Sequence, residues 1–581
     1  MTRRVERALL AVALACAGVV ATPGPAGAAA GDFDPSFGTG GVATAPASGT
    51  LPATGAAALA IDPSGRIVAV GATFDTATSR WVFTIHRFLA SGAIDAGFGT
   101  NGLAVVPITT GWSINAVTGV GLQPDGRIVL GARAYPTASP AADRYAVLRL
   151  TSTGVLDTDF DGGVAGNGIL LLSVGPGAGS DVERRLAVDE TGRILVSGVT
   201  VYTGPAQARA TMARLNPDGT FDASFSGDGR FDLLMPTSDS DLKAFADLPG
   251  ANGYALGGRT IPNIAPTIGQ PTVVRISEAG ELVTGFTSSL SDTPGRSTTY
   301  WQGDKAKLGE ITALAGTPGG DLIAGGYQNT GRAAVAKYTS SGGLDGAFGT
   351  GGVTLLQIAG GGSSVNDLVL QPDGKILAAM YGTGASRGYV ARFTAAGVLD
   401  ATFGTGGVVE TDPTGNTDVL ALQADGKIVA IAPRGHPDTT LVRLLGDPAP
   451  PSAAPVAAGP SIQVTAPLGK VVKAKKLKAL AGTAGPVGDV SVVQIALQRV
   501  DKRLLREKQR CLWLASHRGK FKKVPATQER CSQPLYRQAT GTTAWSYGLR
   551  KPLPTGKYVL HVQVRLSDGR TATVQHTFRV R

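Results

Sequence analysis

The sequence is poor in histidine, cysteine and aromatic residues, and these shortages exclude several common kinds of site. It has five histidines and three cysteines in 581 residues, and aromatic residues make up 6%. No two histidines have the spacing of an HExxH metal site, and no Gly-x-Ser-x-Gly elbow or phosphate-binding loop occurs. These absences favour a protein without catalytic activity or an organic cofactor, and they leave an unfamiliar kind of enzyme open.

Long helical patterns are missing as well. Charged residues make up 17% of the chain, and no stretch has the periodicity of a coiled coil or a long amphipathic helix. Glycine is abundant instead, with 81 residues, and apolar residues alternate with polar ones over short segments. This combination is typical of short strands joined by tight turns, so we predict an all-β protein.

The first 30 residues have the three parts of a signal peptide. Basic residues are followed by an apolar stretch from Ala8 to about Ala21 and then by small residues at 26–30, where a signal peptidase can cut. The stretch is short for a membrane span, and we expect no transmembrane segment after its removal. The chain is therefore predicted to be secreted or associated with the cell surface. Lipidation at Cys16 is the alternative to simple cleavage.

Removal of the signal peptide leaves two cysteines, Cys511 and Cys531. An even number in an exported chain favours a disulfide between them, and two buried thiols are the alternative.

Charge is distributed unevenly along the chain. Residues 461–581 hold 24 Lys/Arg against 5 Asp/Glu, a surplus of 19, while the whole chain carries +11, which leaves −8 for the rest. An exported basic domain meets anionic envelope polymers or lipid headgroups before nucleic acid, so we expect an anionic envelope partner and no nucleic acid. Two basic runs, Lys470–Lys478 and Asp501–Arg510, are candidates for this contact; a solvated strand or loop face is the alternative.

The first of two interleaved repeats centres on a glycine that follows an apolar run. Clear copies centre on Gly65, Gly126, Gly192, Gly374 and Gly426, and weaker ones on Gly253 and Gly320. In Gln123-Pro-Asp-Gly126, proline presets its φ, aspartate bonds to the backbone and glycine accepts a positive φ, as a tight turn requires. Alternating segments on both sides predict a hairpin between the first and second strands of each unit.

The second repeat has the pattern Asp-x-x-Phe. It runs from Asp34 to Phe37 and recurs at copies that end in Phe98, Phe160, Phe225, Phe348 and Phe403, with a decayed copy that ends in Phe286. A strand precedes each copy and a short strand follows it. We expect the phenylalanine to pack between neighbouring sheets and the aspartate to bond to its own turn.

The repeats alternate with a period of 52 to 67 residues and four strands per unit, which is typical of a β-propeller blade. Seven copies predict seven blades between residues 31 and 445. The chain begins with a lone strand near Gly41–Thr44 and ends its last unit with a third strand at Thr440–Leu444. We therefore expect the N-terminal strand to complete the seventh sheet and close the ring.

These motifs resemble the delta-60 repeat family of bacterial propeller-type repeats, with its Leu-Asp-x-x-Phe-Gly and Gln-Pro-Asp-Gly-Lys-Ile patterns. The resemblance covers about residues 31–445 and implies a propeller in a secreted or surface setting. It implies no established reaction and no catalytic residues.

A second domain follows the repeats. Residues 446–460 are rich in proline and alanine and read as an extended linker. Residues 461–581 contain alternating segments and a Ser567-Asp-Gly569 hairpin turn. Together with the segment that begins at Leu553 and the strand of Trp545, they resemble a bacterial immunoglobulin-like β-sandwich.

One copy of the second repeat departs from the others in a way that suggests calcium. It contains Asp157, Asp159 and Asp161, followed by Gly162. Alternate carboxylates on a tight loop can converge on Ca²⁺, although glycine stands at the twelfth position, where such loops carry glutamate. An ordinary turn with solvated aspartates is the alternative.

The remaining candidates lie on the face of the propeller that carries the variable loops. These loops span Arg133–Asp143, Thr200–Ala208, Thr260–Gln270 and Thr287–Leu308. Aromatic residues there are candidate ligand contacts because variable loops on a rigid frame often bind: Trp112, Tyr135, Tyr202, Tyr300 and Trp301. Shielding of the blade ends is the alternative.

The sequence thus predicts an exported binding or adhesion scaffold. Its loop face recognises an extracellular glycan or protein, and its basic domain associates with an anionic envelope polymer. An extracellular polysaccharide hydrolase or lyase is an alternative, but no pair of carboxylates stands out from the repeats. A structural spacer without a ligand is another.

Overall fold

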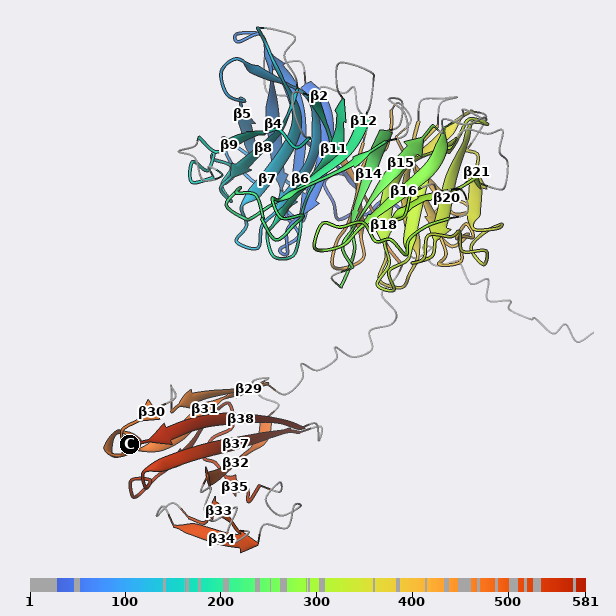
Figure 1. The fold of residues 1–581 in the computed structure, drawn as a ribbon. Coiled ribbons are helices and arrows are strands. Elements are labelled where there is room, and N and C mark those ends of the chain that lie inside the picture. The colour runs from blue at the N-terminus through green and yellow to red at the C-terminus, as the bar shows by residue number, and fades with distance from the viewer. Residues whose placement is uncertain are drawn as a thin grey trace, which may run out of the picture. The chain divides into compact units, whose positions relative to one another are not determined.

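The computed structural model describes most of the chain, and all structural statements refer to the residues in the ranges 29–45, 53–138, 143–160, 162, 167–175, 179–201, 208–235, 241–250, 252–261, 269–288, 290, 293–301, 309–358, 361–382, 387–412, 415–432, 438–447, 461–467, 471–485, 490–500, 510–516, 520–525, 534–567 and 571–581. The chain divides between Ala449 and Pro450 into two compact units. Strands dominate both (Figure 1), and no α-helix occurs in these ranges. No described helix could cross a membrane.

Seven four-stranded antiparallel sheets make up the described part of the N-terminal unit. Sheet 1 contains β2 (Ala53–Ile61), β3 (Ile67–Asp75), β4 (Arg80–Phe88) and β5 (Leu103–Val106). Sheet 2 contains β6 (Trp112–Leu122), β7 (Ile128–Pro136), β8 (Arg144–Leu150) and β9 (Ile169–Leu172). Sheet 3 contains β10 (Ser180–Val188), β11 (Ile194–Val201), β12 (Ala208–Leu215) and β13 (Arg230–Leu234).

The next three sheets repeat this order. Sheet 4 contains β14 (Asp241–Asp247), β15 (Tyr254–Thr260), β16 (Gln270–Ile276) and β17 (Arg296–Thr298). Sheet 5 contains β18 (Gly309–Gly316), β19 (Leu322–Gln328), β20 (Arg332–Tyr338) and β21 (Val353–Leu356). Sheet 6 contains β22 (Ser363–Leu370), β23 (Ile376–Gly382), β24 (Arg387–Phe393) and β25 (Val408–Asp412).

Sheet 7 combines the two ends of the unit. It contains β26 (Leu420–Leu422), β27 (Ile428–Ile431), β28 (Thr439–Leu444) and, at its edge, β1 (Val42–Ala45) from the start of the described chain. β1 pairs antiparallel with β28, and Val42 lies opposite Val442. The predicted pairing of the N-terminal strand with the last sheet is therefore confirmed.

Apolar clusters lie between every pair of neighbouring sheets, from sheets 1 and 2 to sheets 6 and 7. A further cluster joins sheet 7 to sheet 1 and contains Ala43 and Leu441 with Ile67 and Phe88. The main chain also crosses this junction, because the Gly38 amide donates to the Ser91 carbonyl oxygen at 2.8 Å. Sheet 7 is thus packed against sheet 1 as the other sheets are packed against their neighbours.

The first repeat forms the hairpin turns that its composition predicts. Gly126, at the turn between β6 and β7, has φ of +84°, and its amide donates to the Gln123 carbonyl oxygen at 2.8 Å. Only glycine adopts this backbone region without strain. The turn residues thus set the hairpin between the first and second strands.

The second repeat is the basis of a recurring arginine–aspartate–phenylalanine contact. The phenylalanines are buried, and the aspartates bond to their own turns as predicted; Asp34 accepts from the Ser36 amide at 2.9 Å. The third member, which was not predicted, is an arginine on the third strand of the sheet. Its guanidinium lies over the phenylalanine ring in six sheets, at 4.4 to 5.7 Å from the ring centre.

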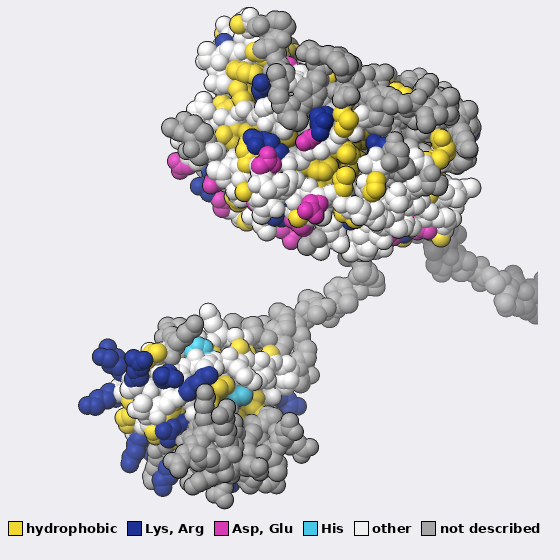
Figure 2. Space-filling model, viewed as in Figure 1, with side chains coloured by type: hydrophobic (Ala, Val, Ile, Leu, Met, Phe, Trp, Pro, Cys, Tyr) yellow, Lys and Arg dark blue, Asp and Glu magenta, His cyan; other side chains and the backbone are white. Residues whose placement is uncertain are grey.

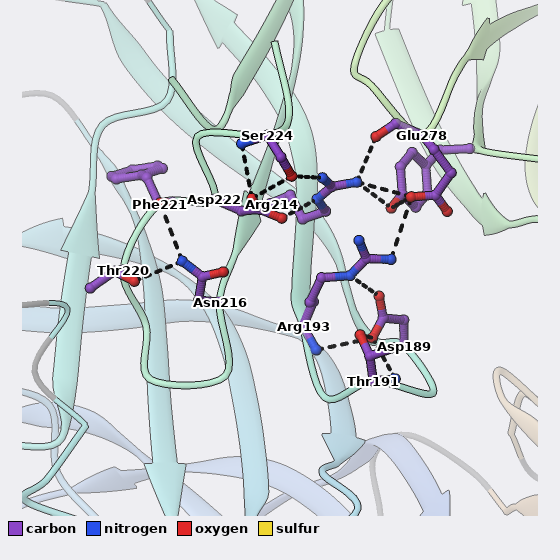
Figure 3. Close-up of polar contacts among 11 residues, drawn as sticks. Asp189, Thr191, Arg193, Arg214, Asn216, Thr220, Phe221, Asp222, Ser224 and Glu278 are labelled. Atoms are coloured by element: carbon purple, nitrogen blue, oxygen red, sulfur yellow. Dashed lines mark hydrogen bonds and ion pairs between the residues drawn. The ribbon is translucent and has the colours of Figure 1, made fainter. Parts of the chain in front are cut away.

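Figure 3 shows the arginine and aspartate of this contact in sheet 3. Arg214 on β12 forms an ion pair with Asp222 at 2.8 Å and stacks on Phe225. It also donates to the carbonyl oxygen of Glu278 at 2.7 Å, in the turn that follows β16 of sheet 4. The arginine therefore fastens its own turn and the neighbouring sheet together.

The N-terminal segment completes the same contact in sheet 7. Arg443 on β28 pairs with Asp34 at 2.9 Å, and its guanidinium lies 4.4 Å from the ring centre of Phe37. Residues that stand more than 400 positions apart in the chain thus form one copy of the repeat. Two copies are altered: lysine replaces arginine at Lys337, and the aspartate position before Phe286 is Val283.

The C-terminal unit consists of two sheets around one apolar core. The smaller sheet pairs β29 (Ser461–Ala466), β31 (Ala479–Gly485) and β36 (Ala544–Gly548). The larger contains β30 (Val471–Val472), β38 (Thr571–Val580), β37 (Gly556–Leu566), β32 (Val490–Val500), β33 (Arg510–Leu514), β34 (Phe521–Pro525) and β35 (Arg537–Gln538); a 3-10 helix, η2 (Ala474–Lys476), follows β30. Trp545 of the smaller sheet packs in the core with Tyr558 and Phe578 of the larger.

Several sequence predictions fall outside the described residues. They include the signal peptide up to residue 28, most of the linker, and Cys531, so that the disulfide with Cys511 stays a prediction.

Candidate functional site in the central channel

The first strands of the seven sheets surround one cavity of about 450 Å³, which we call the channel. Its walls come from β2, β6, β10, β14, β18 and β22 and from the residues just before β26. Each of these strands contacts the next, and β26 contacts β2. Every sheet therefore contributes side chains to the same space.

β-Bulges aim particular residues into the channel. Besides a skip at Asn115 of β6, the strand register skips one residue in each of five first strands: Thr118, Arg184, Lys243, Thr312 and Asn366. All five line the channel. A bulge leaves its extra residue out of the hydrogen-bonded ladder and re-aims the side chain. A uniform backbone thus presents a ring of chemically different groups.

The charges on this ring are separated. Arg184 and Arg185 come from sheet 3 and Lys243 from sheet 4, whereas Asp367 comes from sheet 6 and Asp418 from the segment before sheet 7. The channel therefore has a basic wall and an acidic wall.

Most of these groups bond to the neighbouring first strand. Arg184 pairs with Asp241 at 2.8 Å, and Lys243 pairs with Glu310 at 2.6 Å. Burial alone would raise the pKa of Glu310, but hydrogen bonds from Lys243 and Tyr327 hold that pKa below its ordinary value. These contacts join β10 to β14 and β14 to β18, so part of the ring serves the stability of the unit.

Arg185 is placed differently. Its side chain is exposed to the channel and reaches past β14 to the carbonyl oxygen of Thr312 on β18 at 3.4 Å. A second hydrogen bond, to the carbonyl oxygen of Arg184, is also 3.4 Å long. Both distances exceed the usual 2.7 to 2.9 Å of charge-assisted hydrogen bonds. Its charge also acts on Asp367, and as an exposed cation in the cavity the guanidinium is a candidate contact for an anionic group.

Asp367 faces this basic wall from sheet 6. Its two carboxylate oxygens accept hydrogen bonds from the amides of Leu368 and Leu420, both at 2.9 Å. Burial raises its pKa from 3.8 to about 6, against the hydrogen bond from Leu420 and the charge of Arg185, and the charge of Asp418 adds to the rise. Asp367 can thus change its protonation state in mildly acidic solution.

Replacing Asp367 with asparagine is expected to change how stability depends on pH. Between pH 3.8 and 6 the folded chain holds a proton on Asp367 that the unfolded chain has lost, so the free energy of unfolding falls as pH rises through this window. The fall amounts to at most about 3 kcal/mol. Urea unfolding at pH 4, 5, 6 and 7 should show a smaller fall for Asp367→Asn than for the wild type. Parallel curves for the two proteins would contradict the assignment.

Two of the predicted aromatic contacts, Trp112 and Tyr135, lie near each other in sheet 2. Trp112 begins β6 and lies near Tyr135 of β7, since Ser113 and Tyr135 are strand partners, and both aromatic side chains are half-buried. Tyr300 is also half-buried, and Tyr202 lies outside the described residues. Ligand contact by these residues stays a prediction.

The expected exposure of Trp301 is wrong. Its side chain is 2% exposed and packs in the cluster between sheets 4 and 5. Its indole Nε1 donates to the hydroxyl of Tyr338 at 3.2 Å, and its carbonyl oxygen accepts from Gln328. Trp301 is therefore a core residue, because it folds back onto the sheets instead of remaining in the loop.

The suggested calcium loop contains a carboxylate that is already paired. Asp157 forms ion pairs with Arg149 and Arg127, both at 2.8 Å. Asp159 donates its amide to Asp157, and Asp161 lies outside the described residues. Two cations on the first expected ligand argue against calcium there, and the described residues contain no group of three metal-ligating side chains.

One position in the repeat indicates the ring of residues that lines the channel, although it was not predicted from the sequence. In six units the bulged position, or its equivalent, stands eight residues before the turn glycine, and it is Ala57, Thr118, Arg184, Thr312, Asn366 and Asp418 in turn. A position that varies in charge within an otherwise regular repeat marks a place where the fold does not dictate the residue.

Comparison with solved structures finds proteins of low sequence identity. The β-propeller domain of the Trilobed protease from Pyrococcus furiosus is 9% identical, with 68% of this chain and 95% of that chain covered and a TM-score of 0.35. The α-L-arabinanase from Penicillium chrysogenum is 10% identical, with 69% and 98% covered and a TM-score of 0.32. No curated protein matches the chain. A family model described as a domain of unknown function (DUF5122), β-propeller, matches residues 123–160, 191–225 and 371–403.

Proposed function

We propose that the N-terminal unit is a seven-bladed β-propeller closed by β1 and that the C-terminal unit is an immunoglobulin-like sandwich. The apolar cluster between sheets 7 and 1 and the pairing of β1 with β28 support the closed ring. The two-sheet core supports the sandwich. So does Tyr558, whose hydroxyl donates to the carbonyl oxygen of Pro554 at 2.5 Å, as in the tyrosine corner of such domains.

The function that this geometry supports best is extracellular binding of an acidic glycan end in the channel. The observation that carries it is Arg185, an exposed guanidinium in a cavity of about 450 Å³. Guanidinium groups bind carboxylates with two parallel hydrogen bonds. The acidic wall opposite offers acceptors for sugar hydroxyls, and the volume lies within the usual range of small-ligand sites. The ligand class is therefore a sugar acid at the end of a chain.

Two residues of the ring lie nearer the face with the variable loops, whereas Arg185, the sixth of nine residues of β10, lies nearer the hairpin turns. Lys243 is the third residue of β14 and Thr312 the fourth of β18, and both strands start on that face. The hairpin turns that follow these strands lie on the other face. Trp112 and Tyr135 lie at the variable-loop end of sheet 2, and we propose that they contact the outer part of the ligand.

The remaining parts of the chain support an extracellular setting. The N-terminal 30 residues have the pattern of a signal peptide, and the basic C-terminal unit would hold the propeller near an anionic envelope polymer. The protein then acts as a binding or adhesion scaffold with two ligands, one for each unit.

Replacing Arg185 with glutamine is expected to weaken the binding of a sugar acid about 10- to 100-fold, because a charge-assisted hydrogen bond contributes about 1.5–3 kcal/mol. Galacturonate and its short oligomers are the probes for titration calorimetry with the full chain, and neutral galactose oligomers are the control ligands. The matched control is Arg332→Gln, an exposed arginine on β20 outside the channel. Equal affinity of the wild type and Arg185→Gln, or equal binding of neutral galactose oligomers, would overturn the proposal.

A polysaccharide hydrolase or lyase is the second candidate. The observation in its favour is the raised pKa of Asp367 together with the nearby charge of Asp418, since acid–base catalysis needs carboxylates in different protonation states. Cleavage of polygalacturonate by the wild type and its loss in Asp367→Asn would favour this reading over binding alone.

A further inference from the structure

Among the described residues, the outer face of the larger C-terminal sheet is covered near the middle of β37. Tyr558 and Phe578 point into the core, so the residues that alternate with them on β37 and β38 face outward. Near the middle of β37, Trp513 covers this face with Ala496, and its ring lies 5.4 Å from that of His561. At the end of the sheet where β37 begins, Lys557 and Arg579 are exposed.

The exposed end forms what we call the basic groove. Val471, Lys557, Thr577, Arg579 and Arg581 line it, and its volume is about 400 Å³. Figure 2 shows Lys and Arg side chains gathered at one end of this unit. None of the residues described in residues 461–581 is an aspartate or a glutamate. No described side chain in the unit can therefore neutralise the groove.

The groove contains a like-charged pair that the sheet alone does not favour. Lys557 and Arg579 are direct partners in the antiparallel pairing of β37 with β38. Like charges directly opposite each other on a sheet destabilise it. An anion bound between the two side chains would remove this repulsion and replace it with attraction.

A third cation, Arg581, extends this site along the direction of β38. Arg579 and Arg581 are two residues apart, about 7 Å along an extended strand, and they face the same side. Val471 lies opposite Arg579 on β30 and is 52% exposed, so it offers an apolar contact beside the charges. Two cations spaced along one strand beside an apolar side chain match a chain of anionic groups better than one isolated anion.

We propose that the basic groove binds a linear polyanion with closely spaced phosphate or carboxylate groups. This rests on the proposed function and deepens it, because it assigns the attachment of the C-terminal unit to named residues instead of to its overall charge.

The test compares two double variants of the full chain that lose the same charge. Lys557→Gln/Arg579→Gln removes the pair in the groove, and Lys520→Gln/Arg565→Gln removes two exposed cations elsewhere on the unit. Binding of inorganic polyphosphate and of polyglutamate is measured at low and high salt, and the two probes distinguish phosphate from carboxylate. We expect the groove variant to lose at least 10-fold in affinity and the control less than 2-fold, with a weaker salt dependence in the groove variant.

The outcomes separate this inference from the proposed function. Equal losses in both variants would overturn the groove and leave attachment through overall charge. Absence of binding by the wild type to either polymer would overturn attachment to polyanions itself. The melting temperature should rise in Lys557→Gln without a polymer, since the repulsion is gone, and should rise more in the wild type than in this variant when polyphosphate is added. A fall in the melting temperature of Lys557→Gln would contradict the like-charge argument.

Discussion

Replacing Arg214 with alanine lowers the free energy of unfolding by about 3–5 kcal/mol, the cost expected when one partner of a buried ion pair is removed. The Arg214 side chain is 2% exposed and pairs with Asp222, whose own side chain is 12% exposed. Burial alone would raise the pKa of Asp222, but hydrogen bonds from Ser224 and the charge of Arg214 hold it below its ordinary value. Without Arg214 this carboxylate remains buried next to apolar rings, and sheets 3 and 4 lose a connection.

The matched control is Arg230→Ala in the same sheet. Arg230 also lies over a phenylalanine ring, 3.7 Å from the centre of Phe221, and it also pairs with an aspartate, Asp228. Its side chain is 37% exposed, so its pair is screened by water and contributes less than about 1 kcal/mol. Urea unfolding followed by tryptophan fluorescence measures both variants. Equal, small effects for Arg214→Ala and Arg230→Ala would contradict the structural role given to the repeated arginines.

The strands and hairpin turns could be predicted from the sequence because they depend on residues that lie close together in the chain. Turn residues such as Gly126 and alternating apolar positions depend on neighbours within one hairpin, and the same chemistry recurs in every unit. The pairing of β1 with β28 followed from counting strands, since the first and last units are incomplete by complementary amounts. Neither inference required a contact between distant units to be known.

The repeated arginine was visible but its role was not. Arg87 and Phe98 stand eleven positions apart, on a strand and a later turn, and only folding brings the guanidinium to 4.5 Å from the ring centre. The calcium hypothesis overlooked contacts of the same kind, which only folding creates. Asp157 looked like a free carboxylate among others, because Arg149 reaches it from β8 and Arg127 from the turn before β7.

The burial of Trp301 and the ring of channel residues were not predicted, for a related reason. A long loop does not reveal which of its side chains will fold back, and Trp301 does so because the Tyr338 hydroxyl offers a partner within the core. The channel ring depends on bulges that shift the strand register by one residue. Alternation of apolar and polar residues predicts strands but does not locate such shifts.

A disulfide between Thr44→Cys and Thr440→Cys is expected to form readily and to stabilise the N-terminal unit by about 6 kcal/mol, the chain-entropy estimate for closing a loop of several hundred residues. The two positions are direct partners of β1 and β28. The Arg443 amide donates to the Gly41 carbonyl oxygen, which makes Val42–Val442 and, two residues on, Thr44–Thr440 pairs without mutual hydrogen bonds. Such pairs lie at Cα distances of about 4.5 Å, within the range of disulfides.

The stabilisation appears as a higher urea midpoint for the oxidised than for the reduced form of the same variant. The background carries Cys511→Ser and Cys531→Ser, which prevents other pairings. The control is Thr44→Cys with Ser364→Cys on β22, a position in sheet 6 that is no partner of β1.

The account rests most on the N-terminal strand as part of the last sheet, and the yield of this cross-link tests it directly. Mild oxidation of the folded protein followed by proteolysis and mass spectrometry should recover the peptide that contains residue 44 joined to the peptide that contains residue 440, at high yield and only in the Thr44→Cys/Thr440→Cys variant. Recovery of both thiols free and alkylated from folded protein would show that β1 does not lie beside β28, and neither the closed ring nor the channel inside it would then hold.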